Sequence, residues 1–209
     1  MTMTPADKLK ERTQLIEDTM ALKETSRVLN AIRVDAFPYY EYGISIREAI
    51  TDYQKAIDAY IRFHKEFQPD VASGFTAQVS GPVLENLDVR CLRWAGHGLG
   101  DESTIQFIEY PTIEDEEYDE FFADPAGFAY RKWLPRMAGV FDAFSKIDYM
   151  KMITGNYRGP QSAFLVPPVV DACKRIIAAY DEQQKFNSFA RICGKTLTEE
   201  GFPAFSGGT

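Results

Sequence analysis

The chain has little of the chemistry on which most catalytic and metal sites depend. Its 209 residues include two histidines and three cysteines. The cysteines are Cys91, Cys173 and Cys193; they are odd in number and form no Cys-x-x-Cys pair, which favours reduced thiols over a disulfide framework or a zinc cage. A Gly-x-Ser-x-Gly nucleophile motif is also absent. No catalytic residue and no metal ligand set can be assigned from these motifs.

Long apolar runs and basic patches are missing as well. The longest apolar stretch, residues 163–170, contains Pro167 and Pro168 and is far shorter than a bilayer requires. Five of the six residues at positions 7–12 are charged, where a signal peptide would be apolar. The formal net charge of −8 would repel nucleic acid, since no basic patch offsets it. We therefore expect a cytoplasmic protein with no nucleic-acid and no membrane partner.

Hydrophobic periodicity predicts an α/β chain in which strands and helices alternate. Helices are expected in residues 5–29 (one or two), in a run that Thr51 and Asp52 cap and that ends before Pro69, and in residues 82–87, 113–153 (several short helices) and 169–200. Strands are expected in residues 31–43, 70–75, 89–94, 105–110 and 202–209. The third and fourth of these strands should form a hairpin joined by the glycine-rich loop 96–100.

Few titratable side chains occupy positions that suggest a site. His64 lies on the apolar face of a predicted helix, which is typical of a packed, hydrogen-bonded histidine. His97 lies in the glycine loop, from which a side chain can reach a ligand. That loop is better explained as a hairpin turn than as a phosphate cradle, because it lacks the P-loop lysine and a strand follows it. The acidic run 114–120 is typical of a solvated helix start and lacks the oxygen spacing of a calcium loop.

A cluster of Tyr39, Tyr40, Glu41 and Tyr42 follows the first predicted strand. Folds built from (β/α) units place their ligand sites at the carboxyl ends of the strands. We therefore take these four residues, together with His97, as candidates for a substrate pocket, with Glu41 as the leading one. Ordinary aromatic packing is the alternative for the three tyrosines.

Several sequence blocks occur in a fixed order along nearly the whole chain. They are residues 18–28, Phe37-Pro38-Tyr39-Tyr40, residues 43–49, residues 63–72, Gly81-Pro82-Val83-Leu84-Glu85, Trp94-x-Gly96-His97-Gly98, Asp124-Pro125 and residues 130–136. Together they resemble the uroporphyrinogen decarboxylase superfamily, and in particular its branch of methylcobamide-dependent methyltransferase-like proteins from anaerobic bacteria. Each block is moderately specific, and their order carries more weight.

The resemblance implies a (β/α)8 TIM barrel of roughly twice this length. The expected fold is thus the N-terminal half of a barrel, with a helical appendage over residues 1–30, a partial barrel over residues 31–209 and a long C-terminal helical region. The ending Gly207-Gly208-Thr209 fits a barrel that is cut near its middle. Open strand edges would favour self-association or pairing with a second polypeptide that completes the barrel.

Departures from the family pattern narrow the chemistry. The decarboxylases hold substrate carboxylates with an Arg-Gln-Ala-Gly-Arg segment, where this chain has residues 39–43, and they place an aspartate where this chain has Ala77. Tetrapyrrole decarboxylation is therefore not expected. Leu29 also replaces a proline that usually opens the family's first strand.

The methyltransferase branch binds zinc through residues of its C-terminal half, so zinc and a corrinoid are expected only if that half is supplied. The resemblance thus implies the N-terminal portion of a corrinoid-dependent methyltransferase-like protein, inactive alone, with a corrinoid protein as a further partner. Two alternatives stay open: a non-catalytic binding or assembly module, and a fragment of a longer enzyme.

Overall fold

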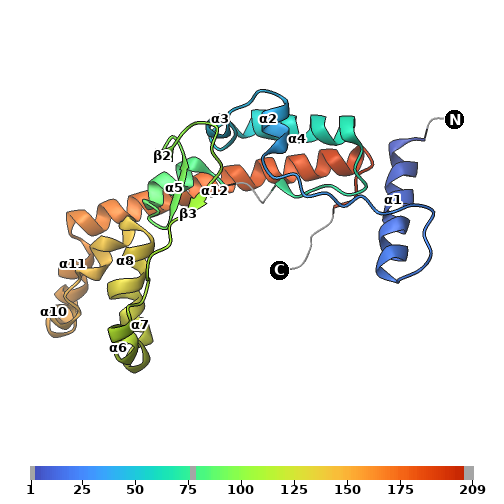
Figure 1. Ribbon diagram of the computed structural model, residues 1–209. Coiled ribbons are helices and arrows are strands. Elements are labelled where there is room, and N and C mark those ends of the chain that lie inside the picture. Colours follow the sequence, from blue (N-terminus) through green and yellow to red (C-terminus); the bar gives the residue numbers. More distant parts are fainter. Residues whose placement is uncertain (1–2, 76–78, 205–209) are drawn as a thin grey trace. The chain divides into compact units, whose positions relative to one another are not determined.

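A computed structural model describes residues 3–75 and 79–204 of the chain (Figure 1). The chain forms two compact units. Unit 1 comprises Met1–Val79 and Gln184–Thr209, and unit 2 comprises Ser80–Gln183. Helix α12 (Pro167–Glu199) supplies residues to both units. The division at residue 30 that the sequence suggested stays a prediction. None of the helices in the described ranges is long and apolar enough to cross a bilayer.

Helix α1 (Pro5–Met20) begins unit 1. The Thr4 side chain accepts a hydrogen bond from the Asp7 N–H, and the Asp7 carboxylate in turn accepts from the Thr4 N–H. This capping box satisfies backbone donors that a helix start leaves unpaired. Of the one or two helices predicted for residues 5–29, one forms, because the chain leaves the helix at Ala21 and Leu22 adopts a positive φ of 56°.

Helix α4 (Tyr53–Phe67) confirms the prediction for this segment. The Asp52 side chain accepts from the Lys55 N–H at its start, and a left-handed Gln68 ends it. Its apolar face is buried, and the Tyr53 ring packs edge-on against Phe186 of α12 with ring centroids 5.4 Å apart. The core of unit 1 therefore lies between α4 and the C-terminal part of α12.

The strand predicted for residues 31–43 is wrong, because helix α2 (Phe37–Glu41) occupies this segment. Its β-type residues, Phe37 and the tyrosines, favoured a strand. Pro38, however, stands in the first turn of α2, where its fixed φ suits a helix and its missing N–H costs nothing. Helix α3 (Ile46–Ala49) follows, capped by Ser45.

The predicted strands 70–75 and 202–209 are represented by one parallel bridge, between Ala72 and Ala204. The Ala72 N–H donates to the Pro203 carbonyl at 2.9 Å. The remainder of these two segments is not a strand where it is described. Residues 76–78, which include Ala77, and residues 205–209 lie outside the described residues.

Unit 2 begins with helix α5 (Gly81–Leu87), as predicted, and a small sheet. The sheet contains β1 (Leu92–Ala95), β2 (Gly98–Leu99) and β3 (Gln106–Phe107) in the order β2-β1-β3. The predicted hairpin is confirmed, since β1 and β3 pair antiparallel with Leu92 opposite Phe107. Gly96 and Gly98 have φ values of 79° and 80°, which glycine adopts without strain.

Short helices make up most of the rest of unit 2, as the sequence predicted for residues 113–153. They are η2 (Asp115–Glu117), α6 (Tyr118–Ala123), α7 (Pro125–Phe128), the π-turn η3 (Ala129–Trp133), α8 (Leu134–Met137), η4 (Gly139–Phe141), α9 (Asp142–Ser145), α10 (Tyr149–Thr154), η5 (Asn156–Arg158) and α11 (Gly159–Phe164). The buried residues Ala138, Val140 and Ala172 form a core cluster that joins α12 to this region.

The expected half-barrel is not what the described residues form. They form a mostly helical chain with one small sheet, and that sheet is a hairpin with a short third strand. The barrel was expected from the family resemblance, and the segments 31–43 and 70–75 were predicted to supply two of its strands. The first is helical, and the second contributes a single bridge.

Candidate functional site

The four pocket candidates of α2 and its C-terminus point to different surroundings. Tyr39 is 1% exposed, and its hydroxyl has no hydrogen-bond partner among the described residues. Burial, with smaller contributions from Tyr60 and Cys193, raises the pKa of the Tyr39 hydroxyl well above its usual value. Tyr40 and Glu41 are exposed to solvent. Within one helical turn, the Tyr39 side chain is therefore buried in the core, whereas those of Tyr40 and Glu41 lie in solvent.

Tyr42 connects the end of α2 to α4. Its hydroxyl donates to the Glu66 carboxylate at 3.0 Å, and the Arg62 guanidinium lies 4.1 Å above its ring. Partial burial and the bond to Glu66 raise the pKa of Tyr42 to about 12. The phenol therefore stays protonated and acts as a hydrogen-bond donor that orients α2.

His97 lies in unit 2, whereas the α2 candidates lie in unit 1. Its exposed ring stacks on Trp94, with the ring centroids 4.2 Å apart and the planes 8° from parallel. Trp94 is buried, and its indole N–H has no partner among the described residues. The structure does not bring the five predicted residues into one described site.

His64 is a structural residue, as its position on an apolar helix face predicted. Its ring is 0% exposed. The Nδ1 atom lies 2.7 Å from the Tyr60 carbonyl, and Nε2 accepts from the Ser73 N–H at 3.2 Å. These partners require a neutral ring with the proton on Nδ1.

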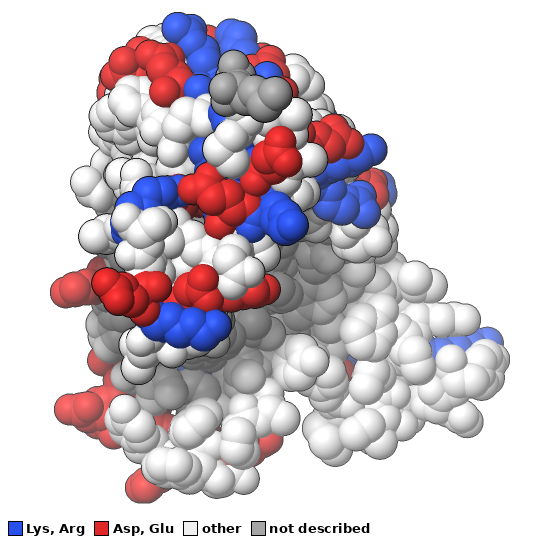
Figure 2. Space-filling view, turned by 90° about the vertical axis from the view of Figure 1, so that its right-hand side faces the viewer, with Lys and Arg blue, Asp and Glu red and all other residues white. Residues whose placement is uncertain are grey.

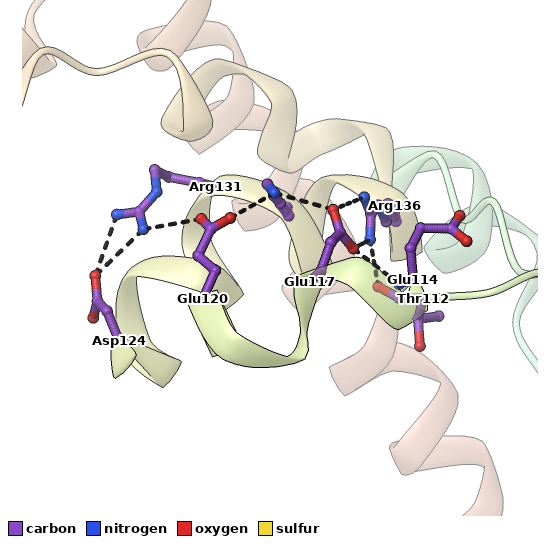
Figure 3. A network of polar contacts seen from close by, with 8 residues as sticks. Thr112, Glu114, Glu117, Glu120, Asp124, Arg131 and Arg136 are labelled. Carbon is purple, nitrogen blue, oxygen red and sulfur yellow. Dashed lines mark hydrogen bonds and ion pairs between the residues drawn. The ribbon is translucent and has the colours of Figure 1, made fainter. Parts of the chain in front are cut away.

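Glu114, Asp115, Glu116 and Asp119 of the acidic run are exposed at the start of η2 and α6, as predicted, whereas Glu117 and Glu120 join an ion-pair network in unit 2 (Figure 3). Glu117 accepts from both Arg136 nitrogens at 2.6 and 2.8 Å, and Glu120 accepts from Lys132 at 2.7 Å. Hydrogen bonds from Arg136 are the main cause that lowers the pKa of Glu117. Glu117 and Glu120 are thus paired with neighbouring cations. No group of three or more potential metal ligands occurs within residues 3–75 and 79–204.

The residues that do form a concave surface in unit 1 were not selected from the sequence. A groove of about 380 Å³ is lined by Asn30, Ile32, Arg33, Val34, Phe37, Phe63, Phe67 and Pro69. Phe63 and Phe67 stack with ring centroids 4.7 Å apart, and Phe37 meets both rings edge-on at 5.8 and 6.1 Å. The groove, which we call the phenylalanine groove, suits a small and largely apolar ligand.

One polar group can orient such a ligand. The Arg33 guanidinium lines the phenylalanine groove and pairs with the exposed carboxylate of Asp35 at 2.9 Å. Exposed pairs of this kind are weak, so Arg33 can turn to an anionic group of a ligand. The i, i+4 spacing of Phe63 and Phe67 was visible in the sequence, but their contact with Phe37 is tertiary.

The chain matched no protein-family model, no curated protein and no solved structure. Its function therefore has to be argued from the sequence blocks and from the geometry described above.

Proposed function

We propose that this chain is the N-terminal portion of a uroporphyrinogen-decarboxylase-like protein of the corrinoid-dependent methyltransferase type. In this proposal the phenylalanine groove binds the small methyl-bearing substrate. The groove is largely apolar, which fits a methyl group on an uncharged carbon skeleton. Catalysis depends on further polypeptide that supplies the metal and corrinoid sites.

The parallel bridge between Ala72 and Ala204 is the main structural support. It pairs the segment after α4 with the segment after α12. Two parallel segments need a crossover connection between them, and a helix usually supplies it. Parallel pairing is also stable chiefly when both faces are covered, and residues 70–72 and 201–203 are buried. Further parallel strands added beside such a pair would extend it into a (β/α) sheet.

Contacts between the family-like blocks give further support. Arg27 belongs to the block 18–28, and its guanidinium donates to the Asp70 carboxylate of the block 63–72 at 2.5 Å. The Asn30 N–H donates to the same carboxylate at 2.7 Å. Phe37 of the next block packs on Phe63. Blocks that are separate in the sequence thus form one packed region of unit 1.

This chain's own contribution is binding and orientation. When bound, a zinc ion would activate a thiol acceptor and a corrinoid would carry the methyl group. The described residues offer no ligand cluster for the metal, so we assign no step through it. Glu41 and His97 stay candidates for contact with the substrate.

The test is methyl transfer by the chain joined to the C-terminal half of a corrinoid-dependent methyltransferase. Methylation of reduced cobalamin by a panel of small methylated donors is followed through the corrinoid's visible spectrum. Replacing Phe67→Ala should raise KM for the active donor about tenfold, because an aromatic contact is worth roughly 1–1.5 kcal/mol. The matched control is Phe107→Ala, which removes an exposed phenylalanine ring of unit 2 that does not line the groove.

Three results bear on separate parts of the proposal. The methyltransferase proposal fails if no donor methylates the corrinoid. The groove assignment fails if Phe67→Ala and Phe107→Ala give the same KM. Unchanged kinetics for both Glu41→Ala and His97→Ala would remove these two residues from the site.

A non-catalytic binding module is the second candidate. It is favoured by the composition of the groove, whose lining residues include no carboxylate, histidine or cysteine. A binding module requires neither corrinoid nor metal. Isothermal titration of the donor panel into the chain alone would show binding that Phe67→Ala weakens, while the joined protein would retain no cobalamin.

A further inference from the structure

We infer that α10 and α11 of unit 2 form a docking surface for a bilayer that contains anionic phospholipids. The surface, which we call the α10–α11 surface, comprises residues 149–165. This inference is independent of the proposed function. Spanning a bilayer needs a long apolar helix, whereas binding at its surface needs exposed apolar side chains flanked by cations.

Exposed apolar side chains are dense on this surface. Met150, Ile153, Tyr157 and Leu165 are each between 67% and 71% exposed, and Tyr149 and Phe164 are about half as exposed. Folded proteins rarely present so many large apolar groups in one short segment unless the segment binds something. Figure 2 shows a largely white lobe at its lower right, with a small blue patch at its edge.

The charge of this surface differs from that of the whole chain. Residues 149–166 contain Lys151 and Arg158 and no aspartate or glutamate, although the chain carries 31 acidic residues. Lys146, just before α10, adds a third cation. None of the three has a carboxylate partner among the described residues, whereas Arg131, Lys132 and Arg136 elsewhere in unit 2 are all paired. Positive charge is therefore available on this surface for an anionic partner.

A cavity adjoins these cations. It has a volume of about 380 Å³ and lies between the end of α9, α10, α11 and the start of α12. Lys146, Lys151 and Ser162 line it together with apolar residues such as Ile147 and Val169. Asp148 also lines it, but its carboxylate accepts from the Lys151 N–H at 2.9 Å and so caps α10. Two lysines and an apolar wall suit a phospholipid headgroup with the start of its acyl chains.

Composition favours a lipid bilayer over a protein partner. Protein interfaces are depleted in lysine, whereas membrane-surface segments combine lysine and arginine with apolar side chains. Tyr149 and Tyr157 are amphipathic aromatics, which collect at membrane interfaces. The long aliphatic stems of Lys146 and Lys151 can lie along the acyl chains while their ammonium groups meet the headgroups.

The experiment is sedimentation of the full chain with vesicles of phosphatidylcholine, with or without phosphatidylglycerol. Binding is expected only with phosphatidylglycerol and should weaken as salt is added. Replacing both Lys151→Gln and Arg158→Gln should lower the affinity by about 30-fold, since each cation near an anionic bilayer contributes roughly a fivefold factor.

A matched pair of variants tests the apolar part. Ile153→Asp on α10 should abolish binding, whereas Phe122→Asp on α6 should leave it unchanged. Phe122 is 71% exposed, as Ile153 is at 70%, but it lies among the carboxylates of α6. Far-UV circular dichroism must show the same helix content for both variants. Equal binding by both variants, or no binding to phosphatidylglycerol vesicles, overturns the inference. So does a dimer, seen by light scattering, that Ile153→Asp dissociates, because a second copy would then occupy the surface.

Discussion

Mild acid should destabilise unit 1 through His64, because the folded environment of this ring admits only its neutral form. The ring is fully buried, the Ser73 N–H already occupies its Nε2 lone pair, and Arg12 adds a nearby positive charge. Burial is the main cause that lowers the pKa of His64, and Arg12 acts in the same direction; the bond to the Tyr60 carbonyl opposes them. Protonation would place a charge in the core and break the hydrogen bond from Ser73.

The sign and size of the effect follow from proton linkage. The pKa of His64 is lower in the folded than in the unfolded chain, so the unfolded chain binds the additional proton. Stability is therefore complete above the unfolded pKa of about 6.5 and is lost as the pH falls below it. Each pH unit in that window costs up to about 1.4 kcal/mol. Between about pH 7.5 and about pH 5.5 the loss should be at most about 1.4 kcal/mol, and few carboxyl groups titrate there.

Urea unfolding at these two pH values measures the effect. Both tryptophans, Trp94 and Trp133, lie in unit 2, so their fluorescence follows that unit, whereas far-UV circular dichroism follows both. The acid-induced shift should appear in circular dichroism with little change in the fluorescence transition. His64→Gln should be less stable at neutral pH and should lose most of the pH dependence. An unchanged wild-type midpoint at the lower pH, or an equal slope in His64→Gln, would refute this explanation.

Three further substitutions should act through contacts that are already described. Asp70→Ala should destabilise unit 1 by about 3–5 kcal/mol, because Arg12, which is 5% exposed, loses its buried counter-charge. Urea unfolding followed by circular dichroism measures this loss, and a midpoint within error of wild type would contradict it. Gly201→Ala should lower the free energy of unfolding by about 1–3 kcal/mol, since the φ of Gly201 is 91° and an added Cβ would lie 2.6 Å from the Pro5 carbonyl oxygen. Thermal unfolding measures this change, and an unchanged Tm would contradict it. Ser80→Ala should cost about 1 kcal/mol by removing the acceptor for the first turn of α5, and the tryptophan fluorescence transition should report it; a shift seen in circular dichroism alone would place the effect elsewhere.

Local signals predicted several of the helices and the hairpin correctly. Asp52 and the apolar spacing from Ile57 to Phe67 predicted α4, and alternation on either side of the glycine loop predicted the hairpin in which Leu92 lies opposite Phe107. These features depend on contacts within a few residues or across one turn. Cap chemistry and side-chain periodicity are therefore sufficient to predict them.

The aromatic segment around Pro38 shows where local signals mislead. Phenylalanine and tyrosine favour strands because they pack well on a pleated surface. In this chain no neighbouring strand is present for residues 37–41 among the described residues, and Tyr39 instead packs on Tyr60 of α4 at 5.9 Å. Tertiary packing, which cannot be read from the sequence, therefore stabilises a helical turn here instead of a strand.

The candidate site was harder to predict than the fold. Tyr39 and Glu41 were selected for their residue types, but one is buried and the other is in solvent. The phenylalanine groove joins Phe37 to residues of α4 about 30 positions later. A concave surface depends on which distant segments meet, and neither composition nor spacing reports that.

The bridge between Ala72 and Ala204 has a consequence for biosynthesis. Unit 1 is interrupted by the whole of unit 2, so the ribosome must add about 125 residues after residue 79 before Ala204 is made. At roughly 5–20 residues per second this takes about 6–25 s. During that interval His64 and Asp70 lack the covering segment, while unit 2, which is continuous, can already fold. Unit 1 can therefore complete its core only after the last part of the chain has been synthesised.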